Sequence, residues 1–308
     1  MFVVVNPSAN GGTARNRWHE IEHALRERIS DIEIQQEDSA SQGAAAVRAA
    51  LDQGVRSVIA VGGDGSVGLA LNALMDPATD RPRNPSIRLG AIGLGSSNDF
   101  HKPFGNRIAG APARIDTQNA RLADVGKATL LLPDGRRIVR YFLINASMGL
   151  VAEGNHSFTT AGGVAKWLKP RNVEMAIVYT ALKSIARLRP LHVEIRSEGW
   201  SEDVRLTNVG VLKSPYFAGG MRYDTGVTND DGQFDINIWS AASRPAVIRL
   251  IAGLYRGKFA GSRLATCRRG RVVEIRPERP SPLELDGEIT VVESARLEVI
   301  PKALLVCA

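Results

Sequence analysis

The sequence predicts an α/β protein with an N-terminal parallel sheet and a second, β-rich domain. The chain has 308 residues, which is long for one ordinary domain and suits two. Up to about residue 124, short Val- and Ile-rich strands alternate with helical stretches, a pattern typical of a parallel sheet covered by helices. From about residue 125, alternating strands joined by turns take over. The domains are therefore expected over residues 1–124 and 125–295, with residues 296–308 free to pack back on the first domain.

The first domain is expected to hold four strands separated by helices and glycine-rich turns. The expected strands cover residues 2–5, 31–36, 57–61 and 87–92. Helices are expected over residues 13–28 and 41–53, and from about Ser66 onward.

The second domain is expected to be built from hairpins. One hairpin covers residues 127–147 and turns at 133–135, and another covers 191–212 and turns near 198–199. Further strands are expected over residues 234–239, 271–277 and 282–287. Two helical stretches, about 172–188 and 244–256, interrupt this pattern.

Composition narrows the class of partner. The formal net charge is +7, which favours anionic partners such as nucleotide phosphates or an acidic lipid surface, although a solvated basic surface without a partner explains it equally well. No zinc-finger, basic-zipper or aromatic RNA-binding pattern is present, so nucleic acid is not expected. No apolar run is long enough to span a membrane, and the first residues lack a signal-peptide pattern. Cys267 and Cys307 show neither metal-ligand spacing nor a disulfide framework, which fits a reducing cytosol.

Three glycine-rich turns follow strands of the expected parallel sheet. They are NPSANGG (6–12), GGDGS (62–66) and GLGSS (93–97). Ligands bind outside the carboxyl ends of such strands, and glycine lets backbone N–H groups approach an anion at a helix N-terminus. The turns match neither G-x-x-x-x-G-K-[ST] nor G-x-G-x-x-G. Three turns on one edge of the sheet nevertheless predict a polyphosphate site.

Asp64 stands in the middle turn, where a bound phosphate would repel it. Two explanations remain open on physical grounds. A Mg²⁺ ion between the carboxylate and the phosphates would turn the repulsion into ligation. Alternatively, Asp64 caps the helix that begins near Ser66.

Five further motifs complete a family pattern around VGGDGS. They are NPSANGG, GLGSSNDF, NASMGLVAE (145–153), GGMRYDTGVTNDDGQFDI (219–236) and LELDGE (283–288). Together they resemble the diacylglycerol kinase catalytic family, which includes bacterial lipid kinases and sphingosine kinases and shares its GGDG turn with NAD kinases and phosphofructokinases. The resemblance implies an NAD kinase-like ATP-binding domain, a β-sandwich-like domain for the lipid substrate, and an active site in the cleft between them.

The resemblance also implies which residues contact the nucleotide. They belong to the first turn, the GGDG turn, the start of the second helix, the turn before NDF, and LADVGK. These residues are Asn6, Pro7, Ser8, Ala9, Asn10, Ser39, Gly62, Gly63, Asp64, Gly65, Ser66, Val67, Gly68, Ser96, Asn98, Asp99 and Asp124.

Phosphoryl transfer to an alcohol needs a general base that accepts the hydroxyl proton. The resemblance points to Glu288 as this base and to Asp286 as a residue that organises it or a catalytic Mg²⁺, with Asp64 as the third catalytic carboxylate. A tight Asp-Gly turn between two strands is the plain alternative for Asp286.

The resemblance further implies a structural Mg²⁺ in TNDDGQF. Its ligands would be the carboxylate of Asp231 and the backbone carbonyls of Thr228 and Gln233. A simple polar turn is the alternative here.

Several positions depart from the family pattern. Ser66 and Ser96 stand where threonine is usual, Leu69 where glutamate is common, and Gly93 where proline is common. None of these removes an assigned carboxylate, but they leave the acceptor open.

Two segments could contact a membrane. GGVAKWLKPRN (162–172) places Trp167 and Leu168 between Lys166, Lys169 and Arg171, and residues 244–259 form an amphipathic helix with basic residues at both ends. Ordinary packing of both helices on the sheet is an equally good interpretation.

The function predicted from these motifs is an ATP- and Mg²⁺-dependent lipid kinase. Its acceptor would be a lipid hydroxyl such as that of diacylglycerol or a sphingoid base. It is expected in the cytoplasm, transiently at the anionic inner face of the membrane, and a homodimer is compatible with the pattern. The alternatives are a soluble-substrate kinase of the NAD kinase type and a non-catalytic nucleotide- or lipid-binding regulator.

Overall fold

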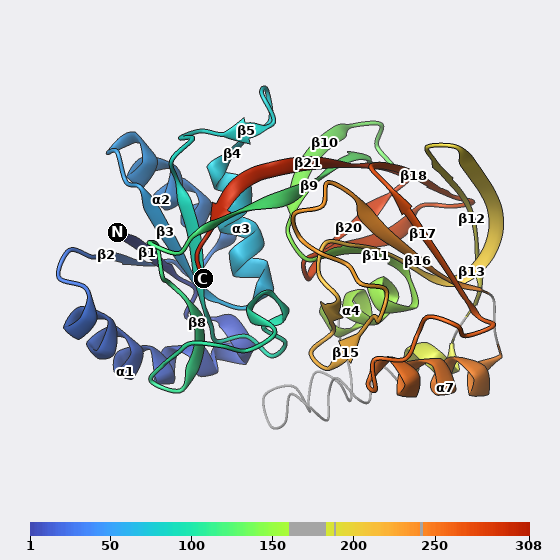
Figure 1. The fold of residues 1–308 in the computed structure, drawn as a ribbon, viewed down its shortest axis with the longest axis horizontal. Helices are drawn as coiled ribbons and strands as arrows, with labels where there is room; N and C mark the ends of the chain where they lie inside the picture. Colours follow the sequence, from blue (N-terminus) through green and yellow to red (C-terminus); the bar gives the residue numbers. More distant parts are fainter. Residues whose placement is uncertain (160–182, 188, 241–242) are drawn as a thin grey trace. The chain divides into compact units, whose positions relative to one another are not determined.

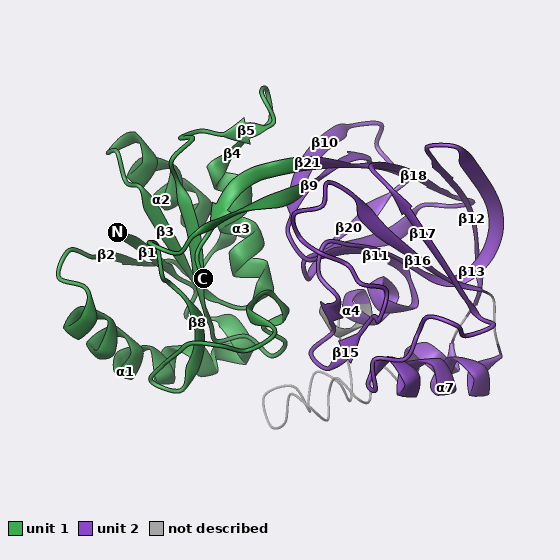
Figure 2. Ribbon diagram, viewed as in Figure 1, with its two compact units in different colours: residues 1–125, 301–308 green, residues 126–300 purple. Residues whose placement is uncertain are grey.

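The computed structural model describes residues 1–159, 183–187, 189–240 and 243–308, and it divides into two compact units (Figure 2). Unit 1 comprises Met1–Val125 and Pro301–Ala308, and unit 2 comprises Gly126–Ile300. Figure 1 gives the element labels used below.

Unit 1 is built on a parallel sheet, as predicted. Its strands are β1 (Phe2–Val5), β2 (Glu33–Gln36), β3 (Ser57–Gly62) and β6 (Arg88–Gly93). They pair in the order β2-β1-β3-β6, and every pair is parallel. The free edge of β6 pairs in parallel with the end of β21 (Ser294–Val306) and antiparallel with β8 (Ala111–Arg114).

Helices cover both faces of this sheet. They are α1 (Thr13–Arg28), α2 (Ala40–Asp52) and α3 (Asp64–Leu74). Trp18, Ile21 and Leu25 of α1 are buried against the face that carries Val3 and Ile59. The neighbouring residue Val4 points to the opposite face, towards α2. Short elements complete the unit: η1 (Ala9–Gly12), β4 (Met75–Asp76), β5 (Arg81–Pro82), η2 (Asp99–His101) and β7 (Arg107–Ile108).

Unit 2 consists mainly of antiparallel strands. They are β9 (Arg121–Leu131), which begins in unit 1, β10 (Arg137–Phe142), β11 (Asn145–Gly149), β12 (Leu191–Ser197), β13 (Trp200–Leu212), β14 (Tyr216–Phe217), β15 (Met221–Arg222), β16 (Phe234–Ser240), β17 (Ala265–Gly270), β18 (Val272–Pro277), β19 (Ser281–Leu285) and β20 (Glu288–Val292). The two predicted hairpins are confirmed as β9–β10 and β12–β13. Gly135 and Gly199 supply positive φ angles at their turns.

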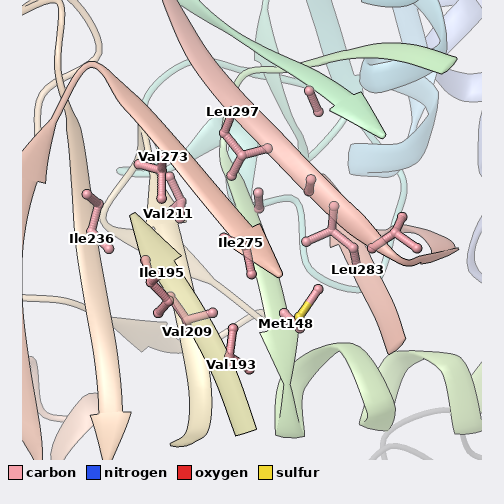
Figure 3. Packing of buried hydrophobic residues seen from close by; sticks show 14 of the residues in the cluster. Met148, Val193, Ile195, Val209, Val211, Ile236, Val273, Ile275, Leu283 and Leu297 are labelled. Carbon is pink, nitrogen blue, oxygen red and sulfur yellow. The ribbon is translucent and has the colours of Figure 1, made fainter. Parts of the chain in front are cut away.

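Alternate residues of these strands form the core of unit 2 (Figure 3). Val193 and Ile195 of β12 are fully buried, as are Val209 and Val211 of β13, because side chains two apart on a strand point to the same face. Apolar residues that alternate along β12 therefore mark the face of this strand that is buried.

Unit 2 also carries the helices α4 (Leu150–Thr159) and α7 (Arg244–Leu254). Val247, Leu250 and Leu254 of α7 are buried in a cluster with Trp239 and Phe259, so the helix expected over 244–256 packs on the unit. Its other face remains exposed.

Part of the predicted membrane surface lies outside the described residues. This applies to the segment with Lys166, Trp167, Leu168, Lys169 and Arg171, and to most of the helix expected over 172–188. Among the residues that are described, no helix is long and apolar enough to cross a membrane.

Candidate active site

The strand order of unit 1 makes the carboxyl ends of β1 and β3 the candidate ligand site. These strands are neighbours, but the chain continues from β1 outward to β2 and from β3 outward to β6, in the opposite direction. Such a reversal of strand order leaves a crevice at the carboxyl ends of the two central strands, where ligands of open α/β sheets bind. The turns 6–12 and 62–66 both begin there.

Asn6 joins these two turns. Its backbone N–H donates to the carbonyl of Val61 at 2.9 Å, and its side-chain amide donates to Ser66 Oγ at 3.3 Å. Its side-chain oxygen accepts the N–H of Ser8 at 3.0 Å. The first turn and the GGDGS turn are therefore held together through one residue.

The third turn packs on the second by close approach of their backbones. A Cβ atom on Gly95 would collide with the Cα of Gly63, and the N–H of Leu94 donates to the carbonyl of Gly62 at 2.7 Å. The side chain of Asn98 closes the third turn, because it accepts the N–H and donates to the carbonyl of Gly95, both at 2.9 Å. Glycine is required at the contact because a side chain has no space there.

Asp64 ties the GGDGS turn to the NDF segment. Its two carboxylate oxygens accept the N–H groups of Asp99 and Phe100, each at 3.0 Å. The helix α3 begins at Asp64 itself, and its N-cap residue Gly63 makes no side-chain cap bond. The alternative that Asp64 caps its own helix is therefore wrong. The carboxylate instead satisfies the first backbone donors of η2.

Burial, and secondly the negative charge of Asp99, raise the pKa of Asp64 from 3.8 to about 6. The two N–H bonds oppose this rise without cancelling it. Asp99 is itself buried and forms an ion pair with Lys102 at 2.7 Å. The carboxylates of Asp64 and Asp99 are neighbours, and the raised pKa of Asp64 shows that a second negative charge is unfavourable there. Added positive charge would be favourable, which fits a Mg²⁺ ion that arrives with phosphates.

The other residues assigned to the nucleotide are more dispersed. Ser39 follows the carboxyl end of β2 and caps α2, since its Oγ accepts the N–H of Gln42 at 3.3 Å. Ser96 is exposed in the third turn. Asp124 on β9 is fully buried, and its carboxylate accepts the N–H of Lys302 at 2.8 Å. The structure therefore joins the three turns to one another and joins Asp124 to Lys302 near the end of the chain.

In unit 2, the first two residues of the DGE segment form the turn between β19 and β20. Asp286 and Gly287 have φ angles of 47° and 91°, as a tight hairpin turn requires. The Asp286 carboxylate is buried and accepts the N–H groups of Leu143, Ile144 and Asn145 at 2.7, 2.9 and 3.0 Å. Asp286 thus anchors the segment between β10 and β11.

Glu288, the first residue of β20, has an exposed side chain. Among the residues of unit 2 that the structure describes, none donates a hydrogen bond to the Glu288 carboxylate in the way that three backbone N–H groups donate to Asp286. Of the two acids in DGE, Glu288 is therefore the exposed one and Asp286 the buried one.

Three charged residues that lie at these sites were not predicted from the sequence to belong to them. Lys102 pairs with Asp99, and their spacing of three residues is the only local signal. Glu284 is buried beside the DGE turn, where it accepts the hydroxyl of Ser147 at 2.7 Å and the N–H of Gly287. Lys213 lies against the 228–233 loop. Across the described part of the chain, no three His, Cys, Asp or Glu side chains gather as a metal site.

Comparison with known families decides the classification. Residues 1–128 match the family model of the diacylglycerol kinase catalytic domain, and residues 151–308 match that of the YegS C-terminal NAD kinase beta sandwich-like domain. The chain belongs to the diacylglycerol kinase family.

Relatives of this diacylglycerol kinase family member cover nearly its whole length. A diacylglycerol kinase of Mycobacterium tuberculosis is 26% identical over 98% of this chain and 93% of its own length. A Stenotrophomonas maltophilia protein named "Probable lipid kinase YegS-like" is 26% identical over 83% of this chain and 79% of its own. A solved structure from Bacillus anthracis strain Sterne, of a protein assigned to the diacylglycerol kinases, shares the fold with a TM-score of 0.75 and 22% identity, covering 99% of this chain and 96% of that one.

Proposed function

We propose that this kinase-family protein transfers the γ-phosphate of ATP to the hydroxyl of a lipid alcohol, such as diacylglycerol or a sphingoid base, with the help of Mg²⁺. The observation that carries the proposal is the junction of three glycine turns at the carboxyl ends of β1 and β3. Asn6, Gly63 and Gly95 hold these turns together. Unit 1 is proposed to bind the nucleotide and unit 2 the lipid.

The turns would hold the phosphates through backbone N–H groups at the start of α3. The positive end of the helix dipole and the absence of side chains at Gly62, Gly63 and Gly65 suit a close-lying anion. When bound, Mg²⁺ neutralises charge on the phosphate oxygens. Asp64, in its ionised form, is the residue proposed to hold it, and Lys102 limits the negative charge by pairing with Asp99.

Glu288 is proposed as the general base. In the transfer, the lipid oxygen forms a bond to the γ-phosphorus, the bond between that phosphorus and the bridging oxygen breaks, and ADP leaves with the electron pair. The hydroxyl proton passes to the Glu288 carboxylate. Asp286 fixes the position of the turn through its three hydrogen bonds to backbone N–H groups, and it takes no proton.

Access to a lipid is proposed through the exposed face of α7. Ile248 of α7 and Tyr255, which directly follows the helix as its C-cap, are 51% and 61% exposed. Tyr255 still has helical backbone angles, so the spacing of seven residues places both side chains on the same side. Arg249 and Arg256 follow them directly and are also exposed. Apolar side chains beside basic ones suit the surface of an anionic bilayer, and the protein is proposed to act there from the cytoplasm.

A transfer assay tests the proposal. The purified protein is incubated with γ-labelled ATP, Mg²⁺ and mixed micelles of diacylglycerol or sphingosine, with NAD as a separate acceptor, and products are identified by mass. The proposal predicts labelled phosphatidic acid or sphingoid-base phosphate, formed about 100-fold or more slowly with Asp64→Asn. Labelled NADP as the only product would instead indicate an NAD kinase. Binding of ATP without any labelled acceptor would indicate a non-catalytic regulator.

A further inference from the structure

The ammonium group of Lys213 lies against the 228–233 loop. The family resemblance placed a Mg²⁺ here, held by the Asp231 carboxylate and by the carbonyls of Thr228 and Gln233. In the structure, the Lys213 ammonium lies 2.9 Å from Asp231 Oδ1 and 2.7 Å from the carbonyl oxygen of Gln233. Two of the three expected metal ligands therefore already bind a positive charge.

The side chain of Lys213 is buried inside unit 2. Its side chain is 0% exposed, although a buried ammonium is costly unless paired and hydrogen-bonded. The residue follows directly on β13, and its backbone N–H donates to the carbonyl of Ile144 at 2.8 Å. The ammonium is thus fixed from its own strand and points at the loop.

The remaining sides of Asp231 are also occupied. Arg269 Nη1 lies 3.7 Å from Asp231 Oδ2, and the same guanidinium pairs with Asp235 at 2.8 Å. The N–H of Gln233 donates to Asp231 Oδ1 at 3.1 Å, and the Thr228 side chain also hydrogen-bonds to this carboxylate. Cationic groups and hydrogen-bond donors of the chain therefore surround the Asp231 carboxylate without a metal.

A divalent cation does not fit this arrangement. Mg²⁺ binds oxygen ligands at about 2.0–2.1 Å and repels a neighbouring ammonium, so it would have to displace Lys213 from both oxygens. We propose that Lys213 is a built-in replacement for the metal, which ties the 228–233 loop to β13 and makes the fold of this loop independent of divalent cations.

The same lysine connects the loop to the DGE turn. Ile144, whose carbonyl accepts the N–H groups of Lys213 and Ser214, donates its own N–H to Asp286 Oδ1 at 2.9 Å. An ordered path of hydrogen bonds therefore leads from Asp231 through Lys213 to the turn that precedes Glu288. The value of this path for catalysis rests on the proposed function, whereas the replacement of the metal does not.

Hydrogen exchange measured by mass spectrometry tests the replacement without ATP or lipid. In the wild-type protein, the peptide that spans residues 228–233 is expected to exchange at the same rate in Mg²⁺ and in chelator. Slower exchange of this peptide in Mg²⁺ would overturn the proposal, because it would show that the loop binds the ion. This arm needs no variant and does not depend on turnover, so its failure is separate from a failure of the kinase proposal.

Lys213→Met supplies the complementary arm. Without the ammonium, the peptide is expected to exchange about tenfold faster or more in chelator, and the melting temperature to fall by about 10 °C. Millimolar Mg²⁺ should then slow the exchange again, since Asp231 and the two carbonyls are left for a metal. Lys258→Met, which removes an exposed lysine of the same unit, should change neither quantity. Wild-type exchange in Lys213→Met, or fast exchange that Mg²⁺ does not slow, would contradict the proposal.

Discussion

The carboxylate of Asp64 accepts the backbone N–H of Asp99, 35 residues further along the chain, at 3.0 Å. The aspartate of one glycine turn thereby holds the start of the segment that follows the next turn. A second hydrogen bond comes from the N–H of Phe100. Removal of this carboxylate therefore removes a charge and takes the acceptor away from two backbone N–H groups. Asp64 is consequently a structural residue of unit 1 in addition to its proposed role at the phosphates.

Asp64 should make both stability and nucleotide binding depend on pH. Its pKa is about 6 in the folded protein against 3.8 in an unfolded chain, so the folded state binds this proton more tightly. Its contribution to stability is complete below about pH 4 and is lost as the pH rises through about 6, a change of roughly 3 kcal/mol. Urea unfolding of the wild type and of Asp64→Asn across this range measures the difference, which should shrink by about that amount. A constant difference would show an ordinary pKa.

The affinity for Mg²⁺-ATP should follow the opposite course. Only ionised Asp64 attracts the ion, so the affinity of the wild type should rise as the pH increases through about 6. Asp64→Asn should bind weakly at every pH and lose about 100-fold or more in kcat. Calorimetric titration with a non-hydrolysable ATP analogue checks this. A variant with normal turnover would limit Asp64 to its structural role.

Glu288→Gln and Asp286→Asn should separate chemistry from architecture. Glu288 is exposed, so its replacement should leave the melting temperature and the ATP affinity unchanged while kcat falls by about 10² to 10⁴. Asp286→Asn replaces a buried acceptor of three N–H groups by one that has a single oxygen, and should unfold several degrees earlier. Normal lipid kinase rates in both variants would refute the assignment of DGE to catalysis. A normal Glu288→Gln beside a stable but inactive Asp286→Asn would move the base to Asp286.

Gly95→Ala should weaken nucleotide binding by displacing the third turn from the second. The added Cβ collides with the backbone of Gly63, which cannot move aside as a flexible side chain can. We expect a loss of about tenfold or more in ATP affinity, together with lower stability. Gly105→Ala is the matched control, because a Cβ there meets nothing within 4 Å. Equal affinities of the two variants would mean that the close contact of the turns is unimportant for binding.

Ile248→Ser and Tyr255→Ser test the exposed face of α7. Each should lower binding to vesicles with anionic lipid by about tenfold, since burial of one such side chain stabilises by about 1.5–3 kcal/mol. Cosedimentation with vesicles measures the effect, and added salt should weaken wild-type binding. Val291→Ser, at a 38% exposed position on β20, is the control. Undiminished binding of both α7 variants would place the membrane contact elsewhere.

The fold could be predicted from the sequence to the extent that it depends on local periodicity. Alternation in β12 and the repeat of apolar residues in α1 report burial directly, because neighbouring residues in the chain share the geometry of one element. Glycine-rich turns can likewise be recognised from a few consecutive residues. The partners of Asp64 could not be predicted, since they lie 35 and 36 residues away and depend on how two turns pack. The pairing of Lys213 with Asp231 could not be predicted for the same reason. Nothing in the local sequence indicates that a lysine directly after a strand has a buried side chain.

The end of β21 has a consequence for the order of synthesis. Leu305 and Val306 complete the edge of the unit 1 sheet beside β6, and the N–H of Lys302 satisfies the buried Asp124. The ribosome releases residues 1–125 long before it makes residues 301–308. Until all of unit 2 has been translated, a nascent unit 1 therefore lacks the strand that pairs with Arg88 and Leu89 of β6, while β8 can already pair with Ala91 and Ile92. It also lacks the Lys302 N–H that donates to Asp124. Newly made chains are consequently most exposed to wrong strand pairing at β6 during this interval.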